Sequence, residues 1–184
     1  MRDRKPRKRR ATPPLTAGWL RSEAVAYLQR WPASEVRVRQ LLWKRIRRAQ
    51  SFHGGTDEEA APLVEEVIAA LVEARMLDDM RFATLWVDSL RRRGTSARAI
   101  RFKLREKGVS GDFIQAAIDA HEPDEGEAGS EDSERAAARA YAKRRRLGPF
   151  RVVEDGSWER KQKDLASMAR AGFSFDVAKS VLEG

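Results

Sequence analysis

The residues with the clearest chemical potential in this sequence are cations spaced along two predicted helices. Most of them recur at intervals of three, four or seven residues, which groups them on a helix with 3.6 residues per turn. In the second helix, three Arg lie beside the apolar stripe, and Lys103 and Lys107 lie on its other flank. A display of this kind neutralises phosphates or an acidic protein groove, although solubility alone accounts for any single Lys or Arg. The candidates are Arg37, Arg39, Lys44 and Arg48 in the first helix, and Arg98, Arg101, Lys103, Arg105 and Lys107 in the second.

Side chains that could support catalysis are few and scattered. The sequence contains no Cys, and its two His, at positions 53 and 121, have no matching carboxylate or nucleophile at helical spacing within a predicted helix. Adjacent Asp78 and Asp79 would point about 100° apart on a helix, so helix capping explains them better than a divalent metal. We therefore expect a protein that is not an enzyme and has no metal or cofactor.

The helices that position these cations belong to a repeat in the sequence. Residues 104–118 and 168–182 share one pattern: the end of an apolar helix, a Gly, an apolar residue, a Ser, and an Asp that opens the next helix. Gly108 and Gly172, the glycines of the two copies, are 64 residues apart. Recurrence at this distance indicates an array of small helical units, each completed by its neighbours.

A third, more divergent copy lies nearer the N-terminus. A shift of 62 residues aligns Arg39 with Arg101 and Arg45 with Lys107, but this copy has Ile46 where the Gly is expected. Within the second helix of each copy, only these two cation positions coincide. The positive charge is therefore not one regular stripe along the array.

Apolar residues at helical spacing predict nine helices and an all-α fold. Phe82, Leu85, Trp86 and Leu90 form one such stripe, and no segment alternates long enough to be a strand. We expect three tandem three-helix repeats in an elongated, curved array. The expected helices are 20–30, 34–47 and 59–77; 79–93, 96–107 and 111–121; and 133–147, 157–171 and 174–183.

Composition divides the chain further. The charged fraction of 35% is high and the apolar fraction of 41% is slightly low, which suits a thin, elongated fold better than one deep globular core. The net charge of +9 favours an acidic partner. Without a long apolar stretch we expect no membrane segment and a cytoplasmic protein. The predicted parts are a disordered basic tail (1–18), repeat 1 (19–77), repeat 2 (78–121), an acidic linker (122–132) and repeat 3 (133–184).

Together these features resemble the RecX family, the small bacterial regulators of the RecA recombinase. The resemblance covers residues 19–184, and Ala171 departs from it, because the family usually favours Arg there. The residues that carry it are Arg30 with Ser34 and Glu35; Met76–Asp79 followed by Arg81–Ala83; Gly94 and Ser96; Leu104–Val109; and Gly172–Ser174.

The resemblance implies a non-enzymatic, monomeric protein of DNA repair, homologous recombination and the SOS response. It would bind the RecA filament on DNA along its helical groove and block strand exchange, ATP hydrolysis and co-protease action. Weak binding to single- and double-stranded DNA without sequence specificity would accompany this.

Two other functions remain open. Three-helix units also build helix-turn-helix DNA readers, so a stand-alone, non-specific DNA-binding protein is the alternative. Sequence-specific reading is disfavoured because the charge is spread over several helices and the chain contains no Asn, a common base-reading residue. A nuclease is the weakest candidate, because no cluster of metal ligands is present.

Overall fold

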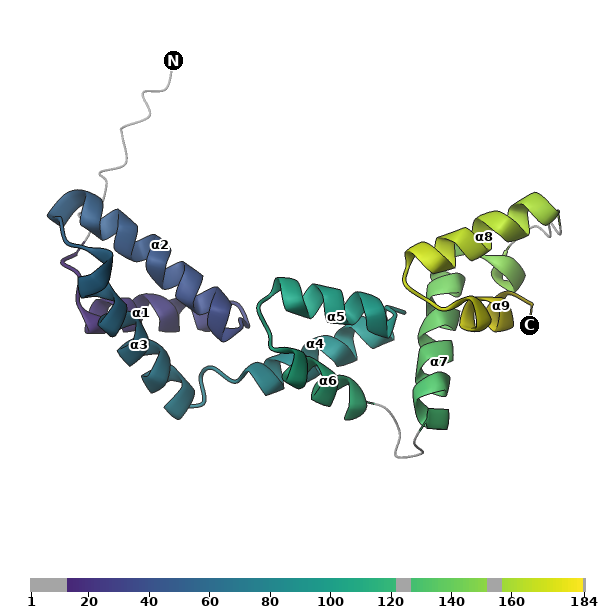
Figure 1. Ribbon diagram of the computed structural model, residues 1–184, viewed down its shortest axis with the longest axis horizontal. Coiled ribbons are helices and arrows are strands. Elements are labelled where there is room, and N and C mark those ends of the chain that lie inside the picture. Colours follow the sequence, from purple (N-terminus) through teal and green to yellow (C-terminus); the bar gives the residue numbers. More distant parts are fainter. Residues whose placement is uncertain (1–12, 122–126, 152–156, 184) are drawn as a thin grey trace, which may run out of the picture. The chain divides into compact units, whose positions relative to one another are not determined.

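The computed structural model describes residues 13–121, 127–151 and 157–183 (Figure 1). Over these residues the secondary structure is nine α-helices and one short 3-10 helix, with no strand. The all-α fold is therefore as predicted. None of the described helices is long and apolar enough to cross a bilayer. Contacts divide the chain into unit 1, residues 1–78, and unit 2, residues 79–184.

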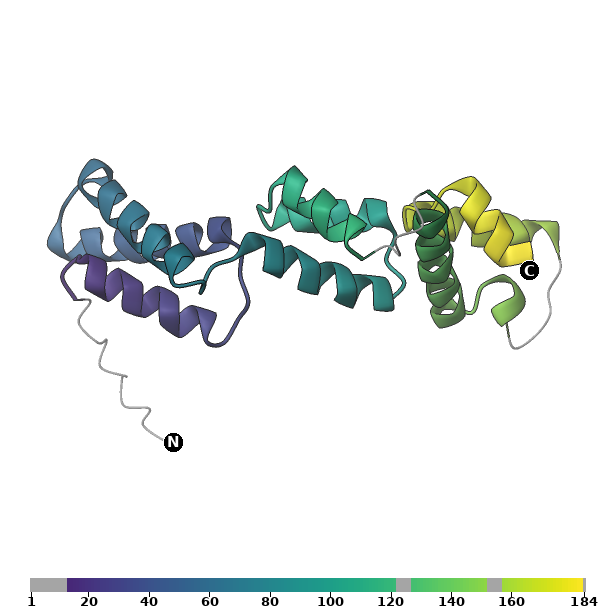
Figure 2. The same cartoon turned by 90° about the horizontal axis from the view of Figure 1, so that it is seen from below.

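Unit 1 is a three-helix bundle whose helices all pack on one another (Figures 1 and 2). Its helices are α1 (Ala17–Leu28), α2 (Glu35–His53) and α3 (Asp57–Glu73). The oxygens of Thr16, Ser34 and Thr56 each accept a backbone N–H of the following turn, which caps the three helices. The core consists of apolar side chains from all three helices, including Leu20, Val38, Leu42, Ile46, Val64 and Leu71.

Helix α2 is longer than the sequence pattern predicted. It was expected to end at residue 47, but it continues to His53 and ends at Gly54, which has φ of 75°. The extension follows from Ala49, which is buried and continues the apolar stripe of the helix by one turn. Gly54 then supplies the left-handed conformation that ends a helix without a Cβ clash.

Unit 2 begins with a second three-helix group. It comprises α4 (Asp79–Arg92), α5 (Ala97–Glu106) and α6 (Gly111–Asp119). Helix α4 packs chiefly against α6, and α5 rests on this pair through Ile100 and Leu104, both fully buried. Gly108, with φ of 78°, ends α5 at the predicted position, and the N–H of Val109 donates to the carbonyl of Leu104 at 3.1 Å.

In the described part of the third group, four of the eight buried core residues are Ala. The group comprises α7 (Glu127–Arg145), the 3-10 helix η1 (Gly148–Phe150), α8 (Trp158–Arg170) and α9 (Phe175–Glu183). Helix α7 crosses α8 and α9 (Figure 1). Its core includes Ala137, Ala138, Ala142, Met168, Phe173 and Val181.

Helix α7 begins six residues before its expected start at residue 133. Part of the predicted acidic linker, 127–132, is therefore helical, and its first residues, 122–126, lie outside the described part of the chain, as do residues 1–12 of the predicted tail. Glu131 and Asp132 pair with Arg135 one turn later, at 2.6 and 3.1 Å. Pairs at this spacing stabilise a helix, so the carboxylates support α7 rather than interrupt it.

Within unit 2 the two groups meet through close backbone contact. Gly94 packs on α7 so tightly that a Cβ there would lie 2.5 Å from the backbone nitrogen of Tyr141. Glu134 of α7 accepts the guanidinium of Arg91, which is 5% exposed, and also caps α5 by accepting the N–H of Ala97 at 3.1 Å. A buried charge with these partners holds the groups together.

Candidate functional site

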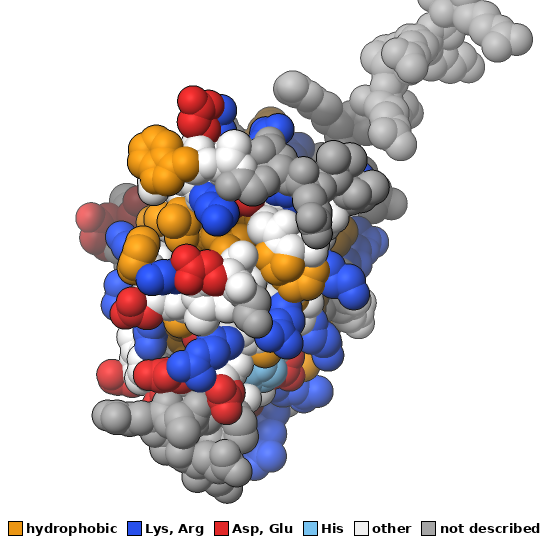
Figure 3. Space-filling view, turned by 90° about the vertical axis from the view of Figure 1, so that its right-hand side faces the viewer, with side chains coloured by type: hydrophobic (Ala, Val, Ile, Leu, Met, Phe, Trp, Pro, Cys, Tyr) orange, Lys and Arg blue, Asp and Glu red, His pale blue; other side chains and the backbone are white. Residues whose placement is uncertain are grey.

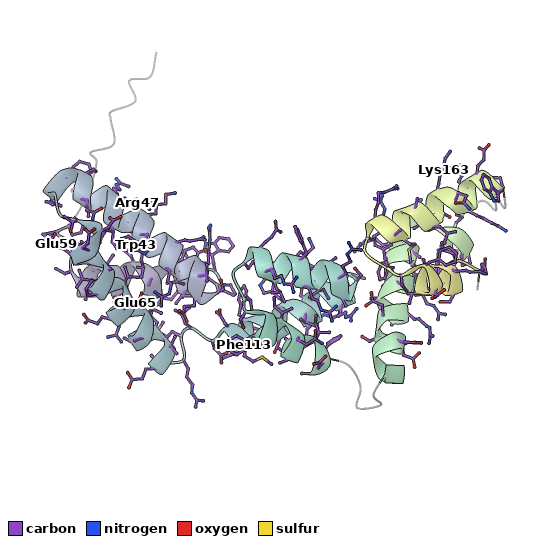
Figure 4. All side chains as sticks on the ribbon, in the orientation of Figure 1. Trp43, Arg47, Glu59, Glu65, Phe113 and Lys163 are labelled. Carbon is purple, nitrogen blue, oxygen red and sulfur yellow. The ribbon has the colours of Figure 1, made fainter. Side chains whose placement is uncertain are left out.

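The outer face of α2 carries exposed cations opposite its buried side chains. Val38, Leu42 and Ile46 are fully buried, so residues on the other side of the helix point to solvent. Arg47 belongs to this set although the sequence analysis did not select it, and Figure 4 shows it on α2. Its spacing of three residues from Lys44 was the available signal. The α2 surface consists of Arg37, Lys44, Arg47 and Arg48.

Helix α5 presents the corresponding surface in unit 2. Arg98 and Arg105 are exposed, opposite the buried Ile100 and Leu104, and Lys103 is exposed on the other flank of that apolar stripe. Phe102 lies one turn from Arg98 and from Arg105, and its side chain is 64% exposed. We call Arg98, Phe102 and Arg105 the α5 surface. It combines positive charge with a large apolar side chain on a short, rigid helix.

Arg39 does not share this exposure, because acidic side chains hold it within unit 1. Its guanidinium binds both carboxylate oxygens of Glu65 on α3, with Nη2 to Oε2 at 2.9 Å, and its Nε donates to Glu35 at 3.0 Å. The hydrogen bond with Glu65 raises the pKa of Arg39. The same bond lowers the pKa of Glu65 below its ordinary value. Arg39 therefore ties α2 to α3.

Arg101 makes the equivalent connection in unit 2 with a neutral partner. Its Nε and Nη2 donate to Oε1 of Gln115 on α6, at 3.3 and 3.0 Å. The amide of Gln115 in turn donates to Asp119 at 2.6 Å. Arg101 is half-buried, so it does not project freely beside Arg98 and Arg105 as the sequence pattern suggested.

Arg45 and Lys107 are the other aligned pair of cations, and each contacts the first helix of its own group. Arg45 lies 2.8 Å from the Glu23 carboxylate on α1, and the Lys107 ammonium lies 4.2 Å from the ring centroid of Trp86 on α4. The cation positions that coincide between repeats thus fasten the second helix to its neighbours. Of the nine predicted residues, three have such contacts and the other six are exposed: Arg37, Lys44, Arg48, Arg98, Lys103 and Arg105.

The two His lie apart from these surfaces. His53 is exposed at the end of α2, whereas Nδ1 of His121 lies 2.8 Å from the Asp88 carboxylate on α4. Spacing within one helix could not reveal this pair, because its residues are 33 positions apart and meet only through the packing of α6 on α4. Over the described ranges, no group of three or more His, Cys, Asp or Glu gathers as a metal site would require.

Comparison with known proteins identifies the family. Residues 78–118 match the model of the RecX second three-helix domain. Regulatory protein RecX of Myxococcus xanthus is 37% identical over 182 residues, covering 99% of this chain and 92% of the relative. The chain belongs to the RecX family. Regulatory protein RecX of Agrobacterium fabrum is 29% identical over 164 residues, covering 89% of this chain and 82% of that protein.

Solved RecX structures share the fold. One crystal structure of regulatory protein RecX has a TM-score of 0.65 at 22% identity, over 91% of this chain and 72% of the other. A second, of RecX from Lactobacillus salivarius, has a TM-score of 0.62 at 17% identity, over 91% and 94% of the two chains. The predicted family and helical-repeat fold are thereby confirmed, and relatives of this RecX chain are named regulatory proteins.

Proposed function

We propose that this protein binds a RecA-type recombinase filament on DNA, in the helical groove of the filament, and inhibits strand exchange, ATP hydrolysis and co-protease activity. It acts without catalysis of its own, as a cytoplasmic monomer, in the regulation of DNA repair and recombination. Membership of a family of regulatory proteins supports the class of function. The weak, non-specific affinity for single- and double-stranded DNA belongs to the same proposal.

The observation that carries the proposal is that some cations of α5 bind neighbouring helices while others on the same helix are exposed. Arg101 and Lys107 are engaged with α6 and α4, which fixes the helix on its repeat. Arg98 and Arg105 remain exposed on the same helix, with Phe102 between them. A cationic face with a central aromatic suits a groove lined by acidic protein or DNA phosphates, because charge steers the encounter and the ring excludes water on contact.

The α2 surface extends the same chemistry to unit 1. Its four cations lie on one face of a helix whose opposite side is buried. A filament offers acidic groups over a long distance, so two cationic surfaces on separate units can bind it simultaneously. Binding through two linked surfaces is tighter than through either one, because the second contact becomes intramolecular.

The test is to reverse the charge of the α5 surface without touching the helix contacts. Arg98→Glu together with Arg105→Glu should raise the concentration needed for half-inhibition of recombinase ATP hydrolysis by about tenfold or more, because like charges then meet. Arg21→Glu together with Arg92→Glu changes the charge equally at exposed positions on α1 and α4 and should have little effect. Equal loss in both variants would contradict the proposed surface.

A stand-alone, non-specific DNA-binding protein is the alternative, favoured by the net charge of +9. Co-sedimentation with recombinase filaments and with bare DNA separates the two functions. The proposal expects filaments to be bound more tightly than bare DNA at the same salt concentration. If both substrates bind equally and the Arg98→Glu, Arg105→Glu variant weakens both to the same extent, the alternative is correct.

A further inference from the structure

One face of helix α7 is exposed. It belongs neither to the α2 and α5 surfaces nor to the contacts between the helix groups. A shallow hollow of about 550 Å³ runs along it. Other faces of the helix contact α4 and α9, whereas this face is largely exposed from residue 131 onward. The α7 groove is lined by Asp132, Arg135, Ala136, Arg139, Ala140 and Lys143.

The cations of the groove differ in their partners along the helix. Arg135, at its beginning, is engaged by Glu131 and Asp132. Arg139 and Lys143, at the following two turns, are exposed, and in the part of the chain that the structure describes neither has an ion pair. Arg144 lies on another face, where its guanidinium donates to the backbone carbonyl of Arg93. Net positive charge is therefore concentrated in the second half of the groove.

Arg146 continues the row at a strained position. It follows the last residue of α7 with φ of 55°, in the left-handed conformation that Gly usually occupies at a helix end. The N–H of Leu147 donates to the carbonyl of Ala142 at 2.9 Å, which completes this helix end. The exposed Arg146 side chain extends the positive charge beyond the helix.

We propose that the α7 groove binds the sugar-phosphate backbone of duplex DNA through Arg139, Lys143 and Arg146. The Ala136 and Ala140 side chains at its floor let a backbone approach closely, and the cations supply phosphate contacts. Single strands are bound mainly by stacking of bases on aromatic side chains, and the groove lining contains none. This inference rests on the weak duplex-DNA affinity included in the proposed function and assigns it a site. Because duplex binding requires no recombinase, its test is separate from that of filament binding by the α2 and α5 surfaces.

Lys and Arg side chains are spread over the face of unit 2 seen in Figure 3, so an experiment must separate the groove from general charge. Binding of a short labelled duplex should be measured by fluorescence anisotropy over a series of KCl concentrations. Arg139→Ala together with Lys143→Ala should weaken binding several-fold. It should also reduce the slope of log affinity against log salt by about two, because each phosphate contact contributes about 0.9. Arg21→Ala with Arg92→Ala removes equal charge elsewhere and should change neither quantity as much.

Arg146→Gly provides a test that a folding defect cannot imitate. Gly suits φ of 55°, so this variant should melt at a higher temperature than the wild type and still bind duplex DNA more weakly. Arg75→Gly is its matched control, because Arg75 in unit 1 has φ of 53° and is also exposed. It should raise the melting temperature and leave DNA affinity unchanged.

Three results would overturn the assignment. Equal losses in the groove variants and their charge-matched controls would show that only overall charge matters. A larger loss for a labelled single strand than for the duplex would contradict the choice of ligand. Unchanged duplex binding, with lost binding of a labelled poly-glutamate peptide, would make the groove a surface for an acidic protein.

Discussion

The first two helix groups use the same repeat positions to hold their second helix, but with different partners. In α1–α3, Arg39 and Arg45 pair with the carboxylates of Glu65 and Glu23. In α4–α6, Arg101 binds the amide of Gln115, and Lys107 lies over Trp86. The two helix groups therefore share a cation at each of these positions but differ in the residue that it contacts. On the second helix, a cation that coincides between the two groups is thus better evidence for a contact between helices than for a binding surface.

A second difference concerns how each group completes its packing. The core of α1–α3 is formed by side chains of its own three helices and the segments that flank them. The α4–α6 group also has a buried contact with α7, through Gly94, Arg91 and Glu134. Stability of the second group should therefore depend on residues in the third.

Replacing Gly94 by Ala should have the largest effect on stability, because the added Cβ would lie 2.5 and 2.7 Å from backbone atoms of α7. Backbone must move and the left-handed conformation becomes strained, so we expect a loss of about 2–4 kcal/mol. Gly18→Ala is the control, since a Cβ on this residue of α1 meets nothing within 4 Å. It should be neutral or stabilising by up to about 1 kcal/mol. Urea unfolding of both variants measures the difference, and equal stabilities would disprove the tight junction.

Substitutions of Arg101 and Arg98 should separate an effect on stability from an effect on binding. Their effects on stability should be smaller than that of Gly94→Ala. Arg101→Ala loses the hydrogen bonds to Gln115 and should destabilise unit 2 by about 0.5–1.5 kcal/mol. Arg98→Ala removes an exposed side chain and should change stability by less than about 0.5 kcal/mol. The order should reverse for inhibition of recombinase ATP hydrolysis, where Arg98→Ala has the larger effect. Parallel changes in both measurements would mean that the two cations share one role.

The sequence was sufficient to predict the all-α fold and the order of the helices. It was insufficient to predict the partners of their charged side chains. Apolar residues at helical spacing identify a buried face from one segment alone, which is why the α5 stripe of Ile100 and Leu104 was predictable. The contact of Arg101 with Gln115 depends on how α6 is rotated against α5. Such rotation follows from the packing of whole helices, so spacing within one helix could not reveal it.

The missed start of α7 has a different cause. The acid-rich composition of 122–132 was interpreted as a linker because it offers no apolar stripe. In the structure Glu131 and Asp132 extend the helix through their pairs with Arg135, which composition alone does not show. Arg47 was missed for a simpler reason, since it lies on the free face of α2 at a spacing that could have been recognised.

The smallest predicted effect is a difference in acid sensitivity between the two kinds of helix contact. Arg39 lowers the pKa of Glu65 in the folded protein, so this carboxylate contributes stability above its unfolded pKa and loses it as pH falls through the folded value. The loss occurs below the ordinary Glu value of 4.5. Glu65→Gln cannot titrate there, so its melting temperature should fall less than that of the wild type between neutral and acidic pH.

Gln115→Glu is the converse test: it gives Arg101 a carboxylate partner, and should make unit 2 more sensitive to acid than it is with the neutral amide. Circular dichroism melts across this range measure both variants, and identical pH profiles for all three proteins would contradict the distinction between charged and neutral partners.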